Sequence, residues 1–414
     1  MRVAFFLKVF PATSETFVVN QITGLLNRGH EVDVFSENRN TTGPWHPDVE
    51  KNQLLARTTY AEGPRGRTIR VVKAASALVT ATLHGRFRIW SLLDNRRFGR
   101  QASNRLLACR VAYRPPYDVV QCHFGPAGIF AQMLRDVGAL RGPMITMFHG
   151  YDVCQYIREN GPDVYKHLFA RGDLFTCPSE FVRNRLITAG CPTEKVQTFK
   201  LGTDLKRFSF KERTLDFSGA IRLVTIARLT EKKGLEYSIR AVAKLSQRFK
   251  KLEYNIIGDG DLRPELARLI EALGVGSKVH LLGHKPQQEM QVLLDQSHVF
   301  VLPSVESRNG DIEGLPAVLL EAQAMGLPVV CTRHSGLPEG ILDGKSGFLV
   351  PERDVDALAD CLADVISRPE AWPEMGRQGR AFIEHEYDLN QRNDALVELY
   401  HQLQERYLMS RRSR

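Results

Sequence analysis

The sequence predicts an α/β protein built from two doubly wound, Rossmann-like domains that face each other across a cleft. Short apolar runs rich in β-branched residues alternate with helical patterns along the whole chain of 414 residues. Because these runs are continuous rather than alternating, the strands should be buried on both faces, as in parallel sheets covered by helices. A chain of this length is too long for one ordinary domain, so two such sheets are expected.

The strands are expected where the apolar runs fall, and the helical patterns between them predict right-handed βαβ crossovers. In the first half of the chain, strands are predicted at residues 2–8, 31–35, 118–122, 144–148 and 173–177. In the second half they are predicted at residues 221–227, 253–257, 278–282, 298–302, 328–331 and 347–350.

A polar, charged stretch at residues 202–219 separates the two sets of strands, so the linker is placed there. Residues 1–203 should then form an amino-terminal domain, and residues 204–385 a carboxyl-terminal domain. Residues 386–414 should hold a final amphipathic helix, over 386–407, that packs back towards the amino-terminal domain. Its apolar positions at helical spacing are Leu389, Leu396, Leu399, Tyr400 and Leu403.

The positive charge of the chain is concentrated in one segment. The whole chain carries +9, and residues 65–114 hold eleven Arg and one Lys against the single acid Asp94. These cations are interleaved with apolar residues such as Phe87 and Trp90, which suits the surface of an anionic membrane. Nucleic acid would also suit a basic segment in principle, and a solvated helix face is the plain structural alternative. Membrane association is the preferred interpretation, and no nucleic-acid partner is expected.

The cysteines and the amino terminus indicate the compartment. Seven cysteines are scattered without a C-x-x-C pair, which argues against a disulfide framework or a structural metal. No run approaches the roughly eighteen apolar residues that span a bilayer, and the opening apolar segment is short and interrupted by Lys8. The protein is therefore predicted to be cytoplasmic, and the basic segment at 65–114 predicts a peripheral place on the cytoplasmic face of the inner membrane.

Two glutamates flank a predicted helix start in the second half. Glu313 lies in a loop that ends at Gly314, and Glu321 follows eight residues later. Leu315 and Pro316 should start the helix, because proline is favoured at the first helical position. The free N–H groups of the first turn could seat a diphosphate, with one carboxylate on each side of it for hydroxyl groups. The alternative is a solvated helix glutamate and an unrelated loop charge.

The residues around this pair resemble glycosyltransferase family 4, a family of retaining enzymes with the GT-B fold. The resemblance covers residues 200–365, and its amino-terminal counterpart, Phe-Pro-x-x-Ser-Glu-Thr-Phe at 10–17, resembles the subgroup that builds bacterial exopolysaccharides such as colanic acid. Paired glycines, common in the family after the first strand, are absent there. The blocks that carry the resemblance are residues 226–234, 257–260, 282–284, 303–304, 310–330, 336–339 and 343–350.

The resemblance implies roles for the donor side. Arg228 and Lys233 should neutralise the donor diphosphate, Glu321 should hold the ribose hydroxyls, and Glu313 should hold hydroxyls of the transferred sugar. The remaining donor contacts are expected from Gly314, Leu315, Pro316, Gly258 and His284. The sequence Asp-Gly-Asp at 259–261 matches a metal-binding pattern, but turn chemistry explains it better. Neither a cofactor nor a metal is therefore expected.

In the amino-terminal half, the candidate residues follow predicted strands, where α/β sheets bind ligands. His149 resembles the family's histidine that faces the donor sugar. The residues expected at the acceptor or in the cleft are Ser14, Glu15, Thr16, His123 and Asp152. Helix capping is the alternative for residues 14–16, and Ser179 is a weaker candidate of the same kind.

The implied activity is transfer of a hexose, with retention, from a nucleotide sugar to a lipid-diphosphate-linked saccharide. UDP-galactose or UDP-glucose is favoured by the subgroup resemblance alone. The alternatives are a GDP-mannose-dependent mannosyltransferase and a non-transferring enzyme of the same fold, such as a nucleotide-sugar epimerase. A dehydrogenase is disfavoured because no G-x-G-x-x-G follows the first strand.

Overall fold

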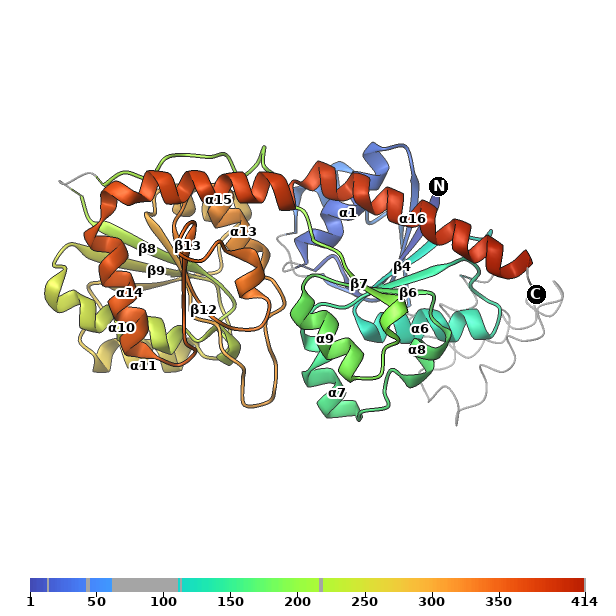
Figure 1. Ribbon diagram of the computed structural model, residues 1–414, viewed down its shortest axis with the longest axis horizontal. Coiled ribbons are helices and arrows are strands. Elements are labelled where there is room, and N and C mark those ends of the chain that lie inside the picture. The colour runs from blue at the N-terminus through green and yellow to red at the C-terminus, as the bar shows by residue number, and fades with distance from the viewer. Residues whose placement is uncertain (13–14, 42–44, 62–110, 112–113, 216–218, 413–414) are drawn as a thin grey trace.

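The computed structural model describes residues 1–12, 15–41, 45–61, 111, 114–215 and 219–412. Two parallel sheets, covered by helices on both faces, lie side by side (Figure 1), and the predicted α/β class is confirmed. The basic segment at 65–114 falls almost wholly outside the described residues. None of the described helices is both long and apolar enough to cross a membrane.

The first sheet has the strand order β3-β2-β1-β4-β5-β6-β7 within the described residues, with all pairings parallel. The order reverses between β1 and β4, which makes this edge the topological switch point where such sheets bind ligands. Its strands are β1 (Arg2–Phe10), β2 (Glu31–Arg39), β3 (Thr58–Tyr60), β4 (Val119–His123), β5 (Met144–Met147), β6 (Leu174–Cys177) and β7 (Val196–Thr198).

The second sheet has the order β10-β9-β8-β11-β12-β13, again parallel and with a reversal between β8 and β11. Its strands are β8 (Ile221–Ile226), β9 (Leu252–Ile257), β10 (Val279–Gly283), β11 (Val299–Leu302), β12 (Val329–Thr332) and β13 (Gly347–Val350). We call the parts of the chain built on the two sheets the amino-terminal and the carboxyl-terminal domain.

The helices cover each sheet in two layers. In the amino-terminal domain, α1 (Thr16–Asn27) packs on one face of the sheet with the end of the chain, and α6 (Gly125–Asp136), α8 (Lys166–Arg171) and α9 (Glu180–Thr188) pack on the other. Two short helices, α2 (Pro47–Lys51) and α7 (Gln155–Asn160), follow strands β2 and β5. Successive residues of β1 alternate between the two cores, since Val3 and Phe5 belong to one and Ala4 and Phe6 to the other.

The carboxyl-terminal domain repeats this arrangement. One face of its sheet is covered by α10 (Leu235–Arg248), α11 (Arg263–Ala272) and α14 (Val355–Ser367). The other is covered by α12 (Gln287–Asp295), α13 (Ala317–Ala324) and α15 (Trp372–Tyr387). Both faces of each sheet are therefore dry, which explains the continuous apolar runs in the sequence.

The end of the chain differs from its prediction. A single helix was expected over residues 386–407, but α15 ends at Tyr387 and α16 runs from Leu389 to Arg412. Asp388, with extended backbone angles φ −58° and ψ 124°, breaks the helix and caps α16 by accepting a bond from the Gln391 N–H at 2.9 Å. Leu396, Leu399, Tyr400 and Leu403 pack on the first sheet beside α1, as expected for a helix that returns to the amino-terminal domain.

The two segments that connect the domains run side by side. The Thr203 N–H donates to the Tyr387 carbonyl at 2.7 Å, and the Leu389 N–H donates to the Thr203 carbonyl at 3.1 Å. The division of the chain at residues 203 and 385 stays a prediction.

Candidate active site between the two domains

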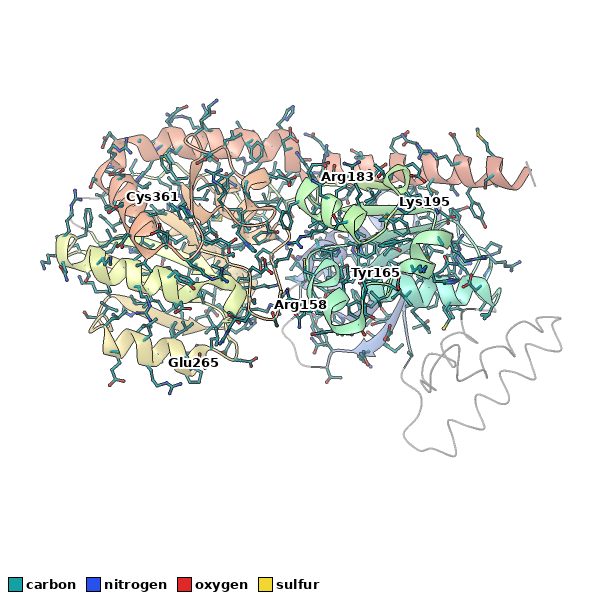
Figure 2. All side chains as sticks on the ribbon, turned by 60° about the horizontal axis from the view of Figure 1, so that its bottom comes forward. Arg158, Tyr165, Arg183, Lys195, Glu265 and Cys361 are labelled. Atoms are coloured by element: carbon teal, nitrogen blue, oxygen red, sulfur yellow. The ribbon has the colours of Figure 1, made fainter. Side chains whose placement is uncertain are left out.

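The two domains touch through glycine loops at the carboxyl ends of their strands. Gly150 follows β5, and Gly314 lies between β11 and α13. A β-carbon on Gly314 would stand 2.3 Å from the carbonyl oxygen of His149, and one on Gly150 would stand 3.0 Å from the amide nitrogen of Gly314. Glycine at both positions therefore lets the His149 loop and the Glu313 loop meet across the domain boundary. Arg158, at the same boundary in Figure 2, donates to the carbonyl of Arg308 at 3.2 Å.

Glu313 is a buried carboxylate held by two lysines. The Lys233 Nζ lies 2.8 Å from Oε2 of Glu313, and the Lys232 Nζ lies 3.6 Å from Oε1, with all three side chains less than a tenth exposed. Burial alone would raise the pKa of Glu313, but the two ammonium groups lower this pKa to about 2. Glu313 is therefore ionised at neutral pH. Sequence reasoning did not single out Lys232, although it neighbours Lys233 in the same motif.

One oxygen of Glu313 lacks a hydrogen bond. Its Oε1 is buried and accepts no hydrogen bond from any residue that the structure describes. A buried polar oxygen left without a donor costs about 1–3 kcal/mol. A hydroxyl group entering from the cleft would satisfy it, which is the chemistry expected of this residue toward a sugar.

The backbone of Glu313 is fixed by residues that the sequence did not reveal. Its N–H donates to Nε2 of His334 at 3.3 Å, and Nδ1 of His334 lies 2.7 Å from Oε1 of Glu352. The hydroxyl of Ser335 donates to the Glu313 carbonyl. His334 follows β12, so its place at a strand end was the one signal that could have identified it.

The helix after Glu313 starts one residue later than predicted. Pro316 does not occupy the first helical position but the N-cap, with φ −72° and ψ 129°, and α13 begins at Ala317. The proline carbonyl accepts the bond from the Leu319 N–H at 3.1 Å, so it closes the first turn from outside the helix. The N–H groups of Ala317 and Val318 belong to the first turn and have no acceptor within the helix. The expected diphosphate seat thus moves to Ala317 and Val318.

Glu321, in the second turn of α13, carries a carboxyl group with a raised pKa. Burial raises its pKa to about 7, and the Arg207 guanidinium lowers the pKa in part. Among the described residues, none forms a hydrogen bond with this carboxyl group. It is therefore available to hydroxyl groups of a ligand.

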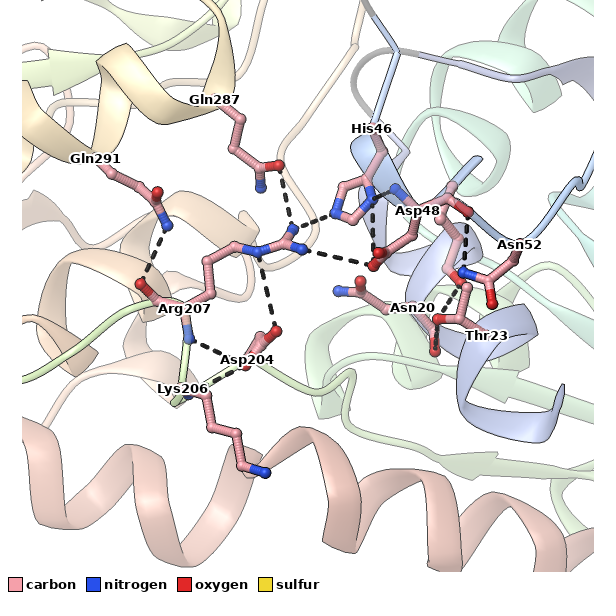
Figure 3. A network of polar contacts seen from close by, with 11 residues as sticks. Asn20, Thr23, His46, Asp48, Asn52, Asp204, Lys206, Arg207, Gln287 and Gln291 are labelled. Atoms are coloured by element: carbon pink, nitrogen blue, oxygen red, sulfur yellow. Dashed lines mark hydrogen bonds and ion pairs between the residues drawn. The ribbon is translucent and has the colours of Figure 1, made fainter. Parts of the chain in front are cut away.

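Arg207, whose charge acts on the Glu321 carboxyl group, connects the two domains, as Figure 3 shows. Its Nη1 contacts Nε2 of His46, from the amino-terminal domain, and lies 3.2 Å from Oε1 of Gln287 on α12. Its Nη2 lies 3.5 Å from Oδ2 of Asp48 on α2. No motif surrounds Arg207 in the sequence, and this contact was not foreseen.

Arg228 lies two residues after the carboxyl end of β8. It is exposed, and its guanidinium forms no hydrogen bond or ion pair within the described part of the chain. Gly258 supports this loop, because its φ is +134° and a β-carbon there would stand 1.9 Å from the Ala227 carbonyl oxygen. Gly258 thus acts through packing in this structure, while His284 is exposed just after β10.

Two residues expected at the acceptor or in the cleft lie beneath the surface. His123 and Asp152 are both fully buried, at 0% exposure, so neither side chain is exposed for direct contact with a ligand. Asp152 is turned inward because its carboxylate accepts the N–H groups of His149 at 2.9 Å and of Gly150 and Gly125 at 3.0 Å. It stabilises the His149 loop. His123 lies directly behind the His149 ring.

The other amino-terminal candidates are residues 14–16, at the start of α1, and Ser179. Burial raises the pKa of Glu15 to about 7, Arg228 lowers it in part, and Glu15 makes no side-chain cap on α1. Thr16 is the first residue of α1, and Ser14 lies outside the described residues. Ser179 is 1% exposed and caps α9 by accepting the Val182 N–H at 3.3 Å, so it has a structural role.

The Asp-Gly-Asp turn shows ordinary turn chemistry. Oδ1 of Asp259 accepts the Gly260 N–H at 2.9 Å. Within the described ranges, no group of three or more His, Cys, Asp or Glu side chains is arranged to hold a metal ion.

Two doubly wound sheets whose loops meet at the carboxyl ends of their strands, with the cation Arg228, a helix N-terminus and acids at the boundary, have the arrangement of the GT-B fold. The family model described as "Glycosyltransferase Family 4" matches residues 14–207, and the family model described as "Glycosyl transferases group 1" matches residues 207–382.

Named relatives agree. The chain is 40% identical to the putative colanic acid biosynthesis glycosyltransferase WcaL of Salmonella typhimurium, over 88% of this chain and 90% of the relative. It is 37% identical to the amylovoran biosynthesis glycosyltransferase AmsK of Erwinia amylovora, over 87% and 90%. The structure of Anabaena HepE in complex with UDP and glucose superimposes with a TM-score of 0.70 at 16% identity, over 97% of this chain and 100% of HepE.

The chain belongs to glycosyltransferase family 4. The resemblance expected from the sequence is thereby confirmed, and so are the GT-B fold and the activity class.

Proposed function

We propose that this protein transfers a hexose, with retention, from a nucleotide sugar to a lipid-diphosphate-linked saccharide in bacterial exopolysaccharide biosynthesis. The observation that carries the proposal is the buried, ionised Glu313, whose Oε1 lacks a hydrogen-bond donor at the point where the domains meet. An ionised acceptor in that position suits hydroxyl groups of a bound sugar.

The donor would lie along the boundary between the domains. Glu321 would hold the ribose hydroxyls, and the first-turn N–H groups of α13 with Arg228 would hold the diphosphate. The sugar would then lie between Glu313 and His149. Fixed positive charge where the leaving phosphate develops charge is the main electrostatic requirement of such a transfer. The acceptor would attack the face from which the nucleotide departs, and the departing phosphate would take its proton.

UDP-galactose or UDP-glucose is the favoured donor. The relatives named for colanic acid and amylovoran biosynthesis point to an exopolysaccharide, and HepE was solved with UDP and glucose. Because Arg228 and the two lysines supply the cations, we expect transfer to proceed without a cofactor and to survive excess EDTA.

The acceptor and the location follow from the same proposal. A lipid-diphosphate acceptor would be presented at the cytoplasmic face of the inner membrane, and the basic segment at 65–114 would bind its anionic surface. Liposome sedimentation with and without anionic lipid, at two salt concentrations, tests this. Binding that is absent or insensitive to salt would refute the membrane contact.

A panel of nucleotide sugars tests the donor. A true donor should raise the unfolding temperature by mass action, and NMR of the product should show the anomeric configuration of the donor retained. Turnover of GDP-mannose alone would replace the donor assignment, and an epimerised nucleotide sugar formed without acceptor would replace the reaction. The variant Glu321→Ala should fold and lose transfer; full activity in it would remove the proposed donor site.

A further inference from the structure

Behind His149 lies a chain of hydrogen bonds that the transfer reaction does not by itself explain. Nε2 of His149 lies 3.2 Å from Nδ1 of His123, and Nε2 of His123 lies 2.9 Å from Oε1 of Gln21. These residues come from three elements, because Gln21 belongs to α1, His123 ends β4, and His149 follows β5. The chain therefore exists only once the first sheet and α1 have assembled.

The inner part of this chain, behind the half-buried His149, is shielded from water. Gln21 is 5% exposed and His123 is fully buried. The two imidazole rings stack with centroids 5.4 Å apart, and the rings of Phe17 and Phe124 flank His149 at 4.6 and 4.5 Å. Phe124 adopts a φ of 70°, a backbone conformation that a bulky residue rarely takes, and this places its ring against His149. Burial also lowers the pKa of His123 to about 3, so its ring is neutral at physiological pH.

The order of donors along the chain follows from the amide oxygen of Gln21. An amide oxygen can only accept a hydrogen bond, so Nε2 of His123 must carry the proton. A neutral His123 then has a lone pair at Nδ1, which accepts from Nε2–H of His149. His149 is left with its lone pair on Nδ1, and this nitrogen has no hydrogen-bond partner among the described residues.

We propose that Gln21 and His123 are positioning residues that fix His149 as its Nε2–H tautomer and so make Nδ1 an acceptor for a hydroxyl of the donor sugar. The role of the acceptor nitrogen rests on the proposed function, whereas the tautomer is a property of the protein alone. The arrangement follows a general rule, since the ring nitrogen that a histidine offers is set by the bond that its other nitrogen makes.

The direct test is the tautomer of His149 in the ligand-free, full-length protein. Long-range ¹H–¹⁵N spectra of ring-labelled histidine distinguish the two tautomers, and the signals of His123 and His149 are assigned by their loss in single His→Gln variants. We expect both rings to be neutral and protonated at Nε2. A His149 ring protonated at Nδ1 would overturn the proposal, whether or not any nucleotide sugar is turned over.

Substitutions of His123 separate positioning from packing. His123→Phe keeps a ring but removes the acceptor, so kcat should fall about ten- to a hundred-fold, with a much smaller change in the KM of the donor. His123→Asn retains an acceptor oxygen near the place of Nδ1 and should recover most of the kcat. His298→Phe is the matched control, because His298 packs against Trp372 in the other domain.

The variants also have outcomes that would reject the idea. Wild-type kcat in His123→Phe would reject it, and so would an equal loss in His123→Asn, which would indicate packing alone. For Gln21, the variant Gln21→Leu should add a second tautomer to the spectra of both rings, and unchanged spectra would remove Gln21 from the chain. If no nucleotide sugar is transferred by wild-type protein, the proposed function fails while the spectra still decide the tautomer.

Discussion

Replacing Glu313 with glutamine should be the most informative single change in the cleft. The substitution keeps the size of the side chain and removes its charge. Lys233, whose side chain is only 9% exposed, would then lose its carboxylate partner, whereas Lys232 would keep Asp311 at 3.0 Å. Breaking a buried ion pair by removing one partner leaves an uncompensated charge, which typically costs about 3–5 kcal/mol.

The pKa of Glu313 leads to a similar magnitude. A pKa lowered from 4.5 to about 2 corresponds to about 3 kcal/mol of stabilisation at neutral pH. Because the folded-state pKa is depressed, this contribution is present above pH 4.5 and is lost as the pH falls towards 2. For a domain of roughly 150–250 residues, a loss of about 3–5 kcal/mol lowers the unfolding temperature by about 6–20 °C. Transfer should fall about ten- to a hundred-fold, because a charged acceptor becomes a neutral one.

The assay compares Glu313→Gln with a matched surface change. Glu253→Gln removes a carboxylate that is 43% exposed and 4.0 Å from Arg222, so it should cost less than about 1 kcal/mol. Unfolding is followed by calorimetry and transfer by product formation, both at neutral pH. Adding Lys233→Met to Glu313→Gln should recover part of the lost stability, because it removes the lysine that has lost its partner. If the free energies of unfolding of Glu313→Gln and Glu253→Gln differ by less than about 1 kcal/mol, the reasoning about the buried lysines is refuted.

Three further changes probe the rest of the cleft. Burial raises the pKa of Glu321 to about 7. The ligand-free protein should therefore lose stability as the pH rises from about 4.5 through 7. Binding of UDP, in contrast, should require the ionised carboxylate as an acceptor for the ribose hydroxyls. Calorimetry should therefore show that the affinity of wild-type protein for UDP falls up to tenfold per pH unit below about 7. In Glu321→Gln the affinity should be low and independent of pH. The same pH dependence in both proteins would contradict this. Gly314→Ala places a β-carbon 2.3 Å from the His149 carbonyl oxygen and should separate the domains, lowering transfer about a hundred-fold and raising the radius of gyration in small-angle scattering. Its control, Gly276→Ala, meets only a side chain at 4.0 Å and should change neither. Arg228→Ala should have a free energy of unfolding within about 0.5 kcal/mol of wild type yet bind UDP at least tenfold more weakly. Unaltered UDP binding would exclude Arg228 from the diphosphate site.

The fold could be predicted because its strands are defined locally. The predicted strands are mostly buried apolar runs, and all but one appear in the structure within two residues of their expected bounds. The exception is the strand predicted at 31–35, which continues to Arg39. The strands that were missed, β3 and β7, have three residues each and are partly exposed, so they lack a continuous apolar run. The helix break at Asp388 was missed because it depends on pairing with Thr203, far away in the sequence.

The site was predictable where a residue's role follows from its place at a strand end. His149 was selected in this way, whereas Arg228 and Glu313 were selected from sequence blocks that resemble the family. Gln21 and Arg207 were not, because their partners lie 102 and 161 residues away and only the folded chain brings them together. Position at a strand end is not sufficient at His123, since the last residue of a buried strand can point into the core.

The polar groups between the domains fall into two sets, one fixed by hydrogen bonds within the protein and one without hydrogen-bond partners in the described part of the chain. On the side of the proposed sugar, His149 and Glu313 are fixed by buried partners, the first through His123 and Asp152 and the second through Lys233 and its backbone bonds. On the side of the proposed nucleotide, the side chains of Arg228 and Glu321 have no hydrogen-bond partner among the described residues. Groups already fixed before the donor arrives need little reorganisation as charge develops at the sugar, which favours the transition state. Groups left unpaired gain hydrogen bonds only when the nucleotide binds, so they would supply binding energy to hold the donor. This difference explains why changes at Glu313 and His123 should act mainly on kcat, and changes at Arg228 and Glu321 mainly on donor affinity.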